Sequence, residues 1–215
     1  MGAKGDEGDE AGGDDVRITA EQVRALREAT GAGMMDCKRA LEESSGDMER
    51  ATELLRQRGL ASARKRAGRS ANEGMIESYI HFNRRVGSLV EINCETDFVA
   101  NTDEFLTLAR EVALHVASAR PRWTNRDEVP QEVLEAERRV YEGQARGQGK
   151  PESVIERMVA GKLESFFKDT VLVDQPYVRD SSKTVGQLAE EASGKLGEKV
   201  VIRRFALFQL GEELE

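Results

Sequence analysis

Apolar residues recur with a helical period before residue 60 of this chain and with a period of two after Met75. Three helical patterns lie in the first part, each following a residue suited to a helix start: Thr19, Gly33 and Asp47. Thr19 and Gln22 form a capping-box pattern, in which each side chain caps a backbone N–H of the other residue. Gly31 and Gly59 are suited to end the first and the third helix. Residues 17–60 are therefore predicted to form a compact domain of three helices.

A β-hairpin is the first element expected after Met75. Apolar and polar residues alternate from Ile76 to Phe82 and again from Ser88 to Glu95, with a turn sequence between them. Later segments follow this order: helical spacing near 102–120, 130–143, 151–168 and 184–197, and then a strand rich in Val, Ile and Phe at 199–210. The chain is therefore predicted to be α+β, with a small antiparallel sheet of about three strands covered on one face by helices.

Two segments of unusual composition flank the helical domain. Residues 1–16 are almost entirely Gly, Asp, Glu and Ala, so they are predicted to be a disordered acidic tail. Five basic residues stand between Arg58 and Arg69 with no acid among them. They indicate either an RNA-binding patch or a solvated basic helical linker at 61–74. The linker is favoured because no aromatic ring is interleaved for base stacking, and residues 75–215 then form the α+β core.

Composition and charge narrow the classes of function. The 215 residues carry a net charge of −8, and nonspecific nucleic-acid binding by the whole chain needs a cationic surface. No segment approaches the roughly 20 apolar residues that cross a bilayer, and the N-terminus lacks the apolar stretch of a signal peptide. Cys37 and Cys94 provide neither a disulfide framework nor metal-site spacing. We expect a reducing, cytoplasmic setting, no membrane association and no cofactor or metal.

A catalytic constellation cannot be assembled from these residues. His81 and His115 are each better explained as surface or packing residues than as bases, and Cys94 follows Ile92 on an apolar strand face. Gly149-Lys150 resembles the end of a phosphate-binding loop, but Pro151 stands where Ser or Thr is needed. The protein is therefore expected not to be an enzyme and not to bind a nucleotide directly.

The segment Val90–Asn101 is the most informative part of the chain. It begins as a strand, and at Thr96 the alternation stops, with Asp97 directly before Phe98. A strand end that carries these two residues into a loop presents one charge and one apolar wedge to a partner. In the alternative, Phe98 folds back into the core and Asp97 makes a turn. The segment alone favours that alternative.

Four segments together resemble the translation elongation factor Ts family in its short form with a single core: Thr30–Leu41, Val90–Ala100, Ser182–Leu188 and Arg203–Phe205. The similarity extends from about Ile18 to about Glu213, with the two signature segments in the expected order. Members of this family are guanine-nucleotide exchange factors for the GTPase elongation factor Tu. The resemblance implies that the three helices form a ubiquitin-associated-like module. It also implies that two subunits pair as a homodimer to replace the second core half of longer members.

The resemblance also implies which residues contact the GTPase. Phe98 would wedge between partner helices and Asp97 would hydrogen-bond nearby, so that elements supporting the Mg²⁺ ion shift and GDP is released; Thr96 and Val99 would shape the wedge. Met34, Met35 and Lys38 of the helical module are candidates for a second contact. A core position for both methionines and a solvated Lys38 are the alternatives. The rival functions are a non-catalytic helical adaptor or dimerisation protein, and an RNA-binding protein that uses the basic linker.

Overall fold

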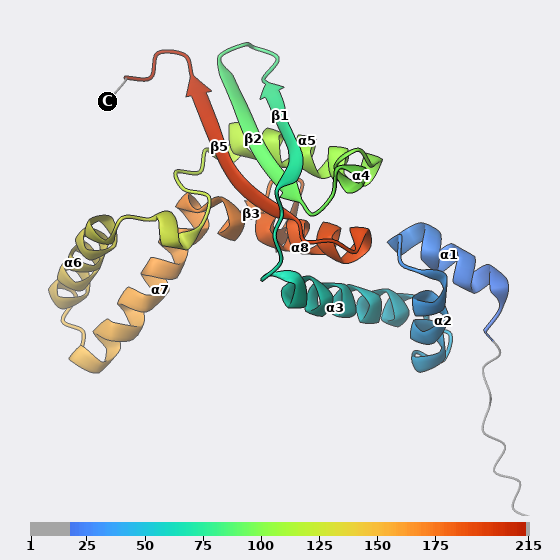
Figure 1. Cartoon of the computed structure of the whole chain (residues 1–215). Helices are drawn as coiled ribbons and strands as arrows, with labels where there is room; N and C mark the ends of the chain where they lie inside the picture. The colour runs from blue at the N-terminus through green and yellow to red at the C-terminus, as the bar shows by residue number, and fades with distance from the viewer. Residues whose placement is uncertain (1–17, 214–215) are drawn as a thin grey trace, which may run out of the picture. The chain divides into compact units, whose positions relative to one another are not determined.

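The computed structural model describes residues 18–213 and divides into two compact units, with the boundary between Gln57 and Arg58 (Figure 1). The boundary falls inside one helix, α3 (Met48–Arg66). Each unit is described by itself. The acidic tail predicted at 1–16 lies outside the described residues. Within the described part of the chain, no helix is both long and apolar enough to span a membrane.

Three helices build the first unit: α1 (Ala20–Thr30), α2 (Met34–Glu43) and the first part of α3. The capping box predicted at Thr19 is present: its backbone N–H donates to Gln22 Oε1 at 2.9 Å, and its hydroxyl accepts from the Gln22 N–H at 3.2 Å. Gly31 ends α1 with a φ of 70°, a left-handed conformation that favours glycine. The core consists of small and branched side chains that are fully buried: Leu26, Cys37, Ala40, Leu41 and Ala51.

Gly59 does not end the third helix, and the prediction that it does is wrong. Helix α3 continues through Gly59 to Arg66. A glycine inside a helix costs only about 1 kcal/mol relative to alanine, and here it lies at a close contact between two backbones. A Cβ atom built on Gly194 would lie 2.9 Å from the Cα of Gly59. This close approach requires glycine at Gly194, whereas a Cβ atom built on Gly59 would lie 3.7 Å from the Cα of Gly194, an ordinary contact.

The second unit is built around an antiparallel sheet in the order β1 (Glu73–Ile80), β2 (Val86–Cys94) and β5 (Val201–Gln209). Helices α5 (Asp103–Ala119) and α8 (Val185–Leu196) cover one face of this sheet (Figure 1). The inward positions of β2 are buried against them, as the period of two predicts. The α+β class with a small three-stranded sheet is thus confirmed.

A helical pair and a small hairpin complete the second unit. Helices α6 (Gln131–Gly147) and α7 (Glu152–Thr170) pack through Ala145, Ile155 and Val159. The strands β3 (Pro176–Tyr177) and β4 (Asp180–Thr184) form a hairpin that the sequence pattern did not reveal. Two short 3₁₀ turns flank these elements, η1 (Arg126–Glu128) and η2 (Leu172–Asp174).

His115 is fully buried and connects α5 to the segment around this hairpin. Its Nε2 lies 2.9 Å from Gln175 Oε1, and its Nδ1 accepts the backbone N–H of Val178 at 3.3 Å. An imidazole that donates from one nitrogen and accepts at the other is neutral. Burial also lowers the pKa of His115 below its ordinary value of 6.5, against the opposing effect of the hydrogen bond to Gln175.

We expect this lowered pKa to make the protein less stable in mild acid. Below about pH 6.5 the unfolded chain binds a proton at His115 that the folded chain does not bind. The free energy of unfolding therefore falls as the pH drops from 6.5 towards the folded pKa, and thermal unfolding between pH 7.5 and 5.5 measures this fall. A His115→Gln variant removes the titrating group, so its melting temperature should depend less on pH. An equally steep dependence in both proteins would contradict the assignment.

Candidate partner-binding site

Strand β2 is followed by a helix of one turn, α4 (Asp97–Ala100). The four residues predicted to form the wedge lie at this junction: Thr96, Asp97, Phe98 and Val99. The loop expected at this place is therefore corrected to a helix. Thr96 is its N-cap: the backbone is extended, and the hydroxyl accepts the Val99 N–H at 3.4 Å. A threonine in this position satisfies a backbone donor that has no partner inside the helix. The helix begins here because Thr96, two residues after the end of β2, caps its first turn.

The four residues divide between two faces of α4. Phe98 is 83% exposed and Asp97 is also exposed, whereas Val99 packs against the core and Ala100 is buried. The alternative in which Phe98 folds back into its own core is therefore wrong. Burying a side chain of this size is worth about 1.5–3 kcal/mol. Phe98 is thus an apolar side chain available to a partner.

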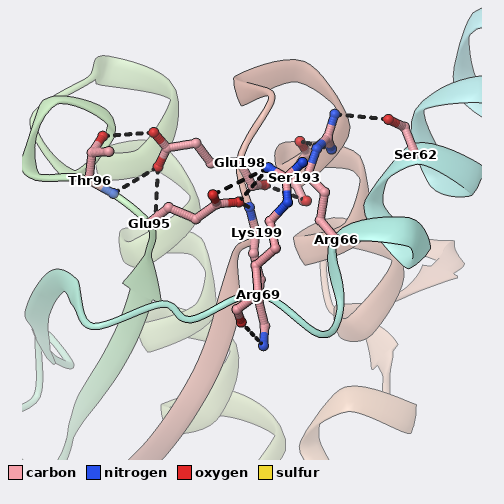
Figure 2. Close-up of polar contacts among 8 residues, drawn as sticks. All are labelled: Ser62, Arg66, Arg69, Glu95, Thr96, Ser193, Glu198 and Lys199. Carbon is pink, nitrogen blue, oxygen red and sulfur yellow. Dashed lines mark hydrogen bonds and ion pairs between the residues drawn. The ribbon is translucent and has the colours of Figure 1, made fainter.

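A carboxylate from a distant part of the chain holds the backbone at the start of α4 (Figure 2). Glu198, in the connection between α8 and β5, accepts three hydrogen bonds. Its Oε2 takes the N–H groups of Glu95 and Thr96 at 3.1 and 3.0 Å, and its Oε1 takes the Thr96 hydroxyl at 2.7 Å. Sequence reasoning missed Glu198, because more than one hundred residues separate it from Thr96 and no motif joins the two positions.

Glu95 makes the return contact in the same cluster. One of its oxygens accepts the backbone N–H of Lys199 at 2.6 Å, and the Arg69 guanidinium lies 3.2 Å away. These two interactions, with the backbone N–H first, lower the pKa of the Glu95 carboxyl. The Lys199 ammonium donates to the carbonyl oxygen of Arg69 at 2.7 Å. The end of β2, the start of β5 and the segment after α3 are thus held together by polar contacts, as Figure 2 shows.

The second predicted contact belongs to the first unit. Met34 is 45% exposed and Met35 is 63% exposed in the first turn of α2, so the alternative that buries both in the module core is wrong. Lys38 is also exposed and lies 3.7 Å from Glu42 of the same helix. Two exposed thioethers side by side suit a contact surface, since methionine adapts its shape to a partner. The contact role itself stays a prediction.

The two cysteines are buried thiols. Burial and the nearby Glu198 charge raise the pKa of Cys94 to about 11, and its Sγ donates to the Thr96 carbonyl oxygen at 3.1 Å. Burial likewise raises the pKa of Cys37. Because the thiolate is the nucleophilic form, neither side chain is activated. Among residues 18–213, no group of three or more His, Cys, Asp and Glu side chains is placed to hold a metal ion.

The fold and this site define an α+β protein with an exposed apolar side chain on a turn of helix whose start is held by Glu198. The family model described as elongation factor TS matches residues 60–212. An elongation factor Ts of Carboxydothermus hydrogenoformans is 56% identical over 92% of this chain and 91% of its own length. One from a Thermoanaerobacter species is 54% identical over 92% and 97%, and one from Desulforamulus reducens is 52% identical over 93% and 92%. The chain belongs to the elongation factor Ts family, and the resemblance seen in the sequence is confirmed.

Proposed function

We propose that this protein is a guanine-nucleotide exchange factor that binds elongation factor Tu–GDP and promotes the release of GDP during translation elongation. The observation that carries the proposal is the 83% exposure of Phe98 on a helix whose start is fixed by Glu198. Family membership supports the partner, and the exposed ring supports the mode of contact. The proposed nucleotide exchange takes place in the cytoplasm, where translation factors act.

The proposed mechanism is mechanical and needs no covalent step. Phe98 enters between side chains of the GTPase, and Asp97, exposed beside it, hydrogen-bonds to the partner surface. The inserted ring displaces elements that support the Mg²⁺ ion, and the phosphates of GDP lose part of their hold. This protein and GDP then weaken each other's binding to the GTPase by the same ratio, because coupling between two binding sites is reciprocal. The protein is accordingly an exchange factor and not an enzyme.

A mixture with elongation factor Tu–GDP tests the proposal. We expect this protein to accelerate the release of a fluorescent GDP analogue from the GTPase, and to co-elute with nucleotide-free GTPase on a sizing column. Added GDP should dissociate that complex, as reciprocal coupling requires. Formation of a complex without any faster release of nucleotide would instead favour the alternative of a non-catalytic adaptor.

We propose that the exposed methionines of α2 supply part of the affinity for the same GTPase. Met35→Ala should raise the concentration of factor needed for half-maximal exchange about three- to tenfold and leave the rate at saturation unchanged. The fold should tolerate the change because the side chain is 63% exposed. Val140→Ala, a truncation of an apolar residue that is 52% exposed on α6, is the matched control and should change neither value. A Met35→Ala titration identical to wild type would remove this contact from the proposal.

The resemblance implies a homodimer, and the sheet face opposite α5 and α8 offers an apolar surface for its interface. Four large apolar side chains point away from α5 and α8 and are exposed: Ile76, Ile80, Leu89 and Phe208. Glu91 and Arg204, ionic residues on the same face of the strands, are paired with each other at 2.6 Å. We propose that a second copy covers this face, since a flat apolar surface can pair with itself about a two-fold axis.

RNA binding through the basic linker is less well supported. The side chain of Arg66 donates to Ser62 and to the Ser193 carbonyl oxygen, and Arg69 is paired with Glu95. Contacts to phosphate would have to replace these internal interactions. If RNA binding is not a function of the linker, any binding should be weak and should disappear at moderate salt, because nonspecific binding is strongly salt-dependent.

A further inference from the structure

We propose that Glu198 is a positioning residue for nucleotide exchange, which fixes the direction of Phe98 through Thr96. This inference rests on the proposed exchange function. Glu198 itself touches neither Phe98 nor Asp97 through any hydrogen bond or ion pair found in the structure. The three hydrogen bonds that its carboxylate accepts all come from the two residues that join β2 to α4.

The first step of the argument concerns the two backbone N–H groups. Strand β2 ends at Cys94, and its pairing with β5 ends at Asn93 and Val201. The N–H groups of Glu95 and Thr96 therefore lie beyond the sheet, and both donate to one oxygen of Glu198. Hydrogen bonds to an ionised acceptor are about twice as strong as those between neutral groups. The carboxylate thus fixes the direction in which the chain leaves the sheet.

The second step concerns the Thr96 hydroxyl, which has two partners. It donates to Glu198 Oε1 at 2.7 Å and accepts the Val99 N–H at 3.4 Å. With its proton committed to the carboxylate, the hydroxyl oxygen presents its lone pairs to the helix. A helix of four residues has no stability of its own in water, so its orientation depends on this cap together with the packing of Val99 and Ala100 against the core. Phe98 lies two residues beyond Thr96, so the contacts of the Thr96 hydroxyl with Glu198 and Val99 also set the direction of its ring.

The third step is that Glu198 is itself held in place. Gly197 precedes it in the left-handed conformation that ends α8, with a φ of 76°. The Ser193 hydroxyl donates to the Glu198 carbonyl oxygen at 2.5 Å, and Arg66 Nη1 donates to the Ser193 carbonyl oxygen at 3.0 Å. Glu198 accepts the N–H of Glu95, while Glu95 accepts the N–H of Lys199. This reciprocal pair, visible in Figure 2, gives the carboxylate a single position.

The test compares Glu198→Ala, Phe98→Ala and the double variant in GDP release at a saturating concentration of factor. We expect Glu198→Ala to lower the saturating rate about tenfold and to shift the half-saturating concentration by less than threefold. In the Phe98→Ala background the same change should alter the rate by less than twofold, because a positioning residue has no effect once the ring is absent. In the free Glu198→Ala protein, with no GTPase present, hydrogen exchange of the Glu95, Thr96 and Val99 amides should be faster than in the free wild-type protein.

Two further variants separate positioning from loss of stability. Glu198→Gln keeps the size and one acceptor oxygen but places an N–H₂ group where the Thr96 hydroxyl donates, so we expect a two- to fivefold lower rate in a protein that folds. Glu111→Ala is the matched control. This half-buried carboxylate on α5 binds Tyr177 and Arg179, and its removal should lower the melting temperature while leaving the saturating rate unchanged.

The outcomes distinguish this inference from the function on which it rests. A wild-type rate for Glu198→Ala together with a slow Phe98→Ala would overturn the positioning role and leave the exchange function standing. Equal, multiplicative losses in both backgrounds would also overturn it, because Glu198 would then act independently of the ring. A wild-type rate for Phe98→Ala would instead overturn the wedge role of Phe98, on which the positioning role of Glu198 rests.

Discussion

Phe98→Ala should abolish most of the exchange activity of this protein while leaving its fold intact. Burying a phenylalanine side chain is worth about 1.5–3 kcal/mol, and each 1.4 kcal/mol lost from a transition state lowers a rate tenfold. If the ring is buried only in the complex that releases GDP, its loss lowers the saturating rate about 10- to 100-fold. Since the ring is 83% exposed in the free protein, the melting temperature should change little.

The control for this prediction is Phe82→Ala. Phe82 is 87% exposed, close to the 83% of Phe98, and it lies in the turn between β1 and β2. The same truncation at an equally exposed ring should leave the release of fluorescent GDP unchanged. Equal losses in both variants would show that the assay responds to general loss of apolar surface. An unchanged rate in Phe98→Ala alone would exclude the ring as the wedge.

The fold could be predicted from the sequence wherever periodicity, capping and turn residues agree. The capping box predicted at Thr19 is present in the structure, and the same pattern of Thr and Gln caps α8 at Thr184. The alternation along β1 and β2 predicted the hairpin, but only β2 has a fully buried face, and the apolar residues Ile76 and Ile80 of β1 are exposed. These signals are local, so one chain is enough to find them.

The missed elements share a physical cause, which is that their residues follow no apolar period. Strand β4 (Asp180–Thr184) is polar at all five positions and pairs with a strand of two residues. Helix α4 has only one turn, too short for a helical pattern to show. Gly59 was assigned to helix termination because its packing partner, Gly194, is far away in the sequence. The first two features lack a periodic signal, and the third depends on a tertiary contact.

The candidate site could be predicted only in part for the same reason. The signature around Asp97 and Phe98 is contiguous, so the family resemblance located it directly. The segment alone favoured a buried Phe98, because apolar rings usually pack inside, and only the structure shows that α4 turns the ring outward. Glu198 carries no signal near Thr96 and depends on the fold to reach it.

The open face of the sheet leads to the second large effect, since Leu89→Glu should convert the proposed homodimer into a monomer. Leu89 lies on the central strand, opposite Ser78 on one side and Ala206 on the other, and is 44% exposed. A two-fold axis places two copies of each residue in the interface. Because each Leu89 is only 44% exposed before the subunits meet, losing both leucines removes about 1.3–2.6 kcal/mol. The dissociation constant of the dimer should therefore rise about 10- to 80-fold, and burying two carboxylates should raise it further.

Sedimentation at several concentrations measures this change, and Val178→Glu provides the matched control. Val178 is also 44% exposed, but it lies in the turn between β3 and β4, outside the three-stranded sheet. The same charge introduced there should leave the dimer intact, and both variants should remain folded because neither side chain lies in the core. The melting temperature of Leu89→Glu should fall only by the stabilisation that association gives the wild type. A Leu89→Glu protein that remains dimeric would show that subunits pair through another surface. A wild-type protein that is monomeric at every concentration would remove the dimer from the proposal, and the exposed face would then be available to the GTPase instead.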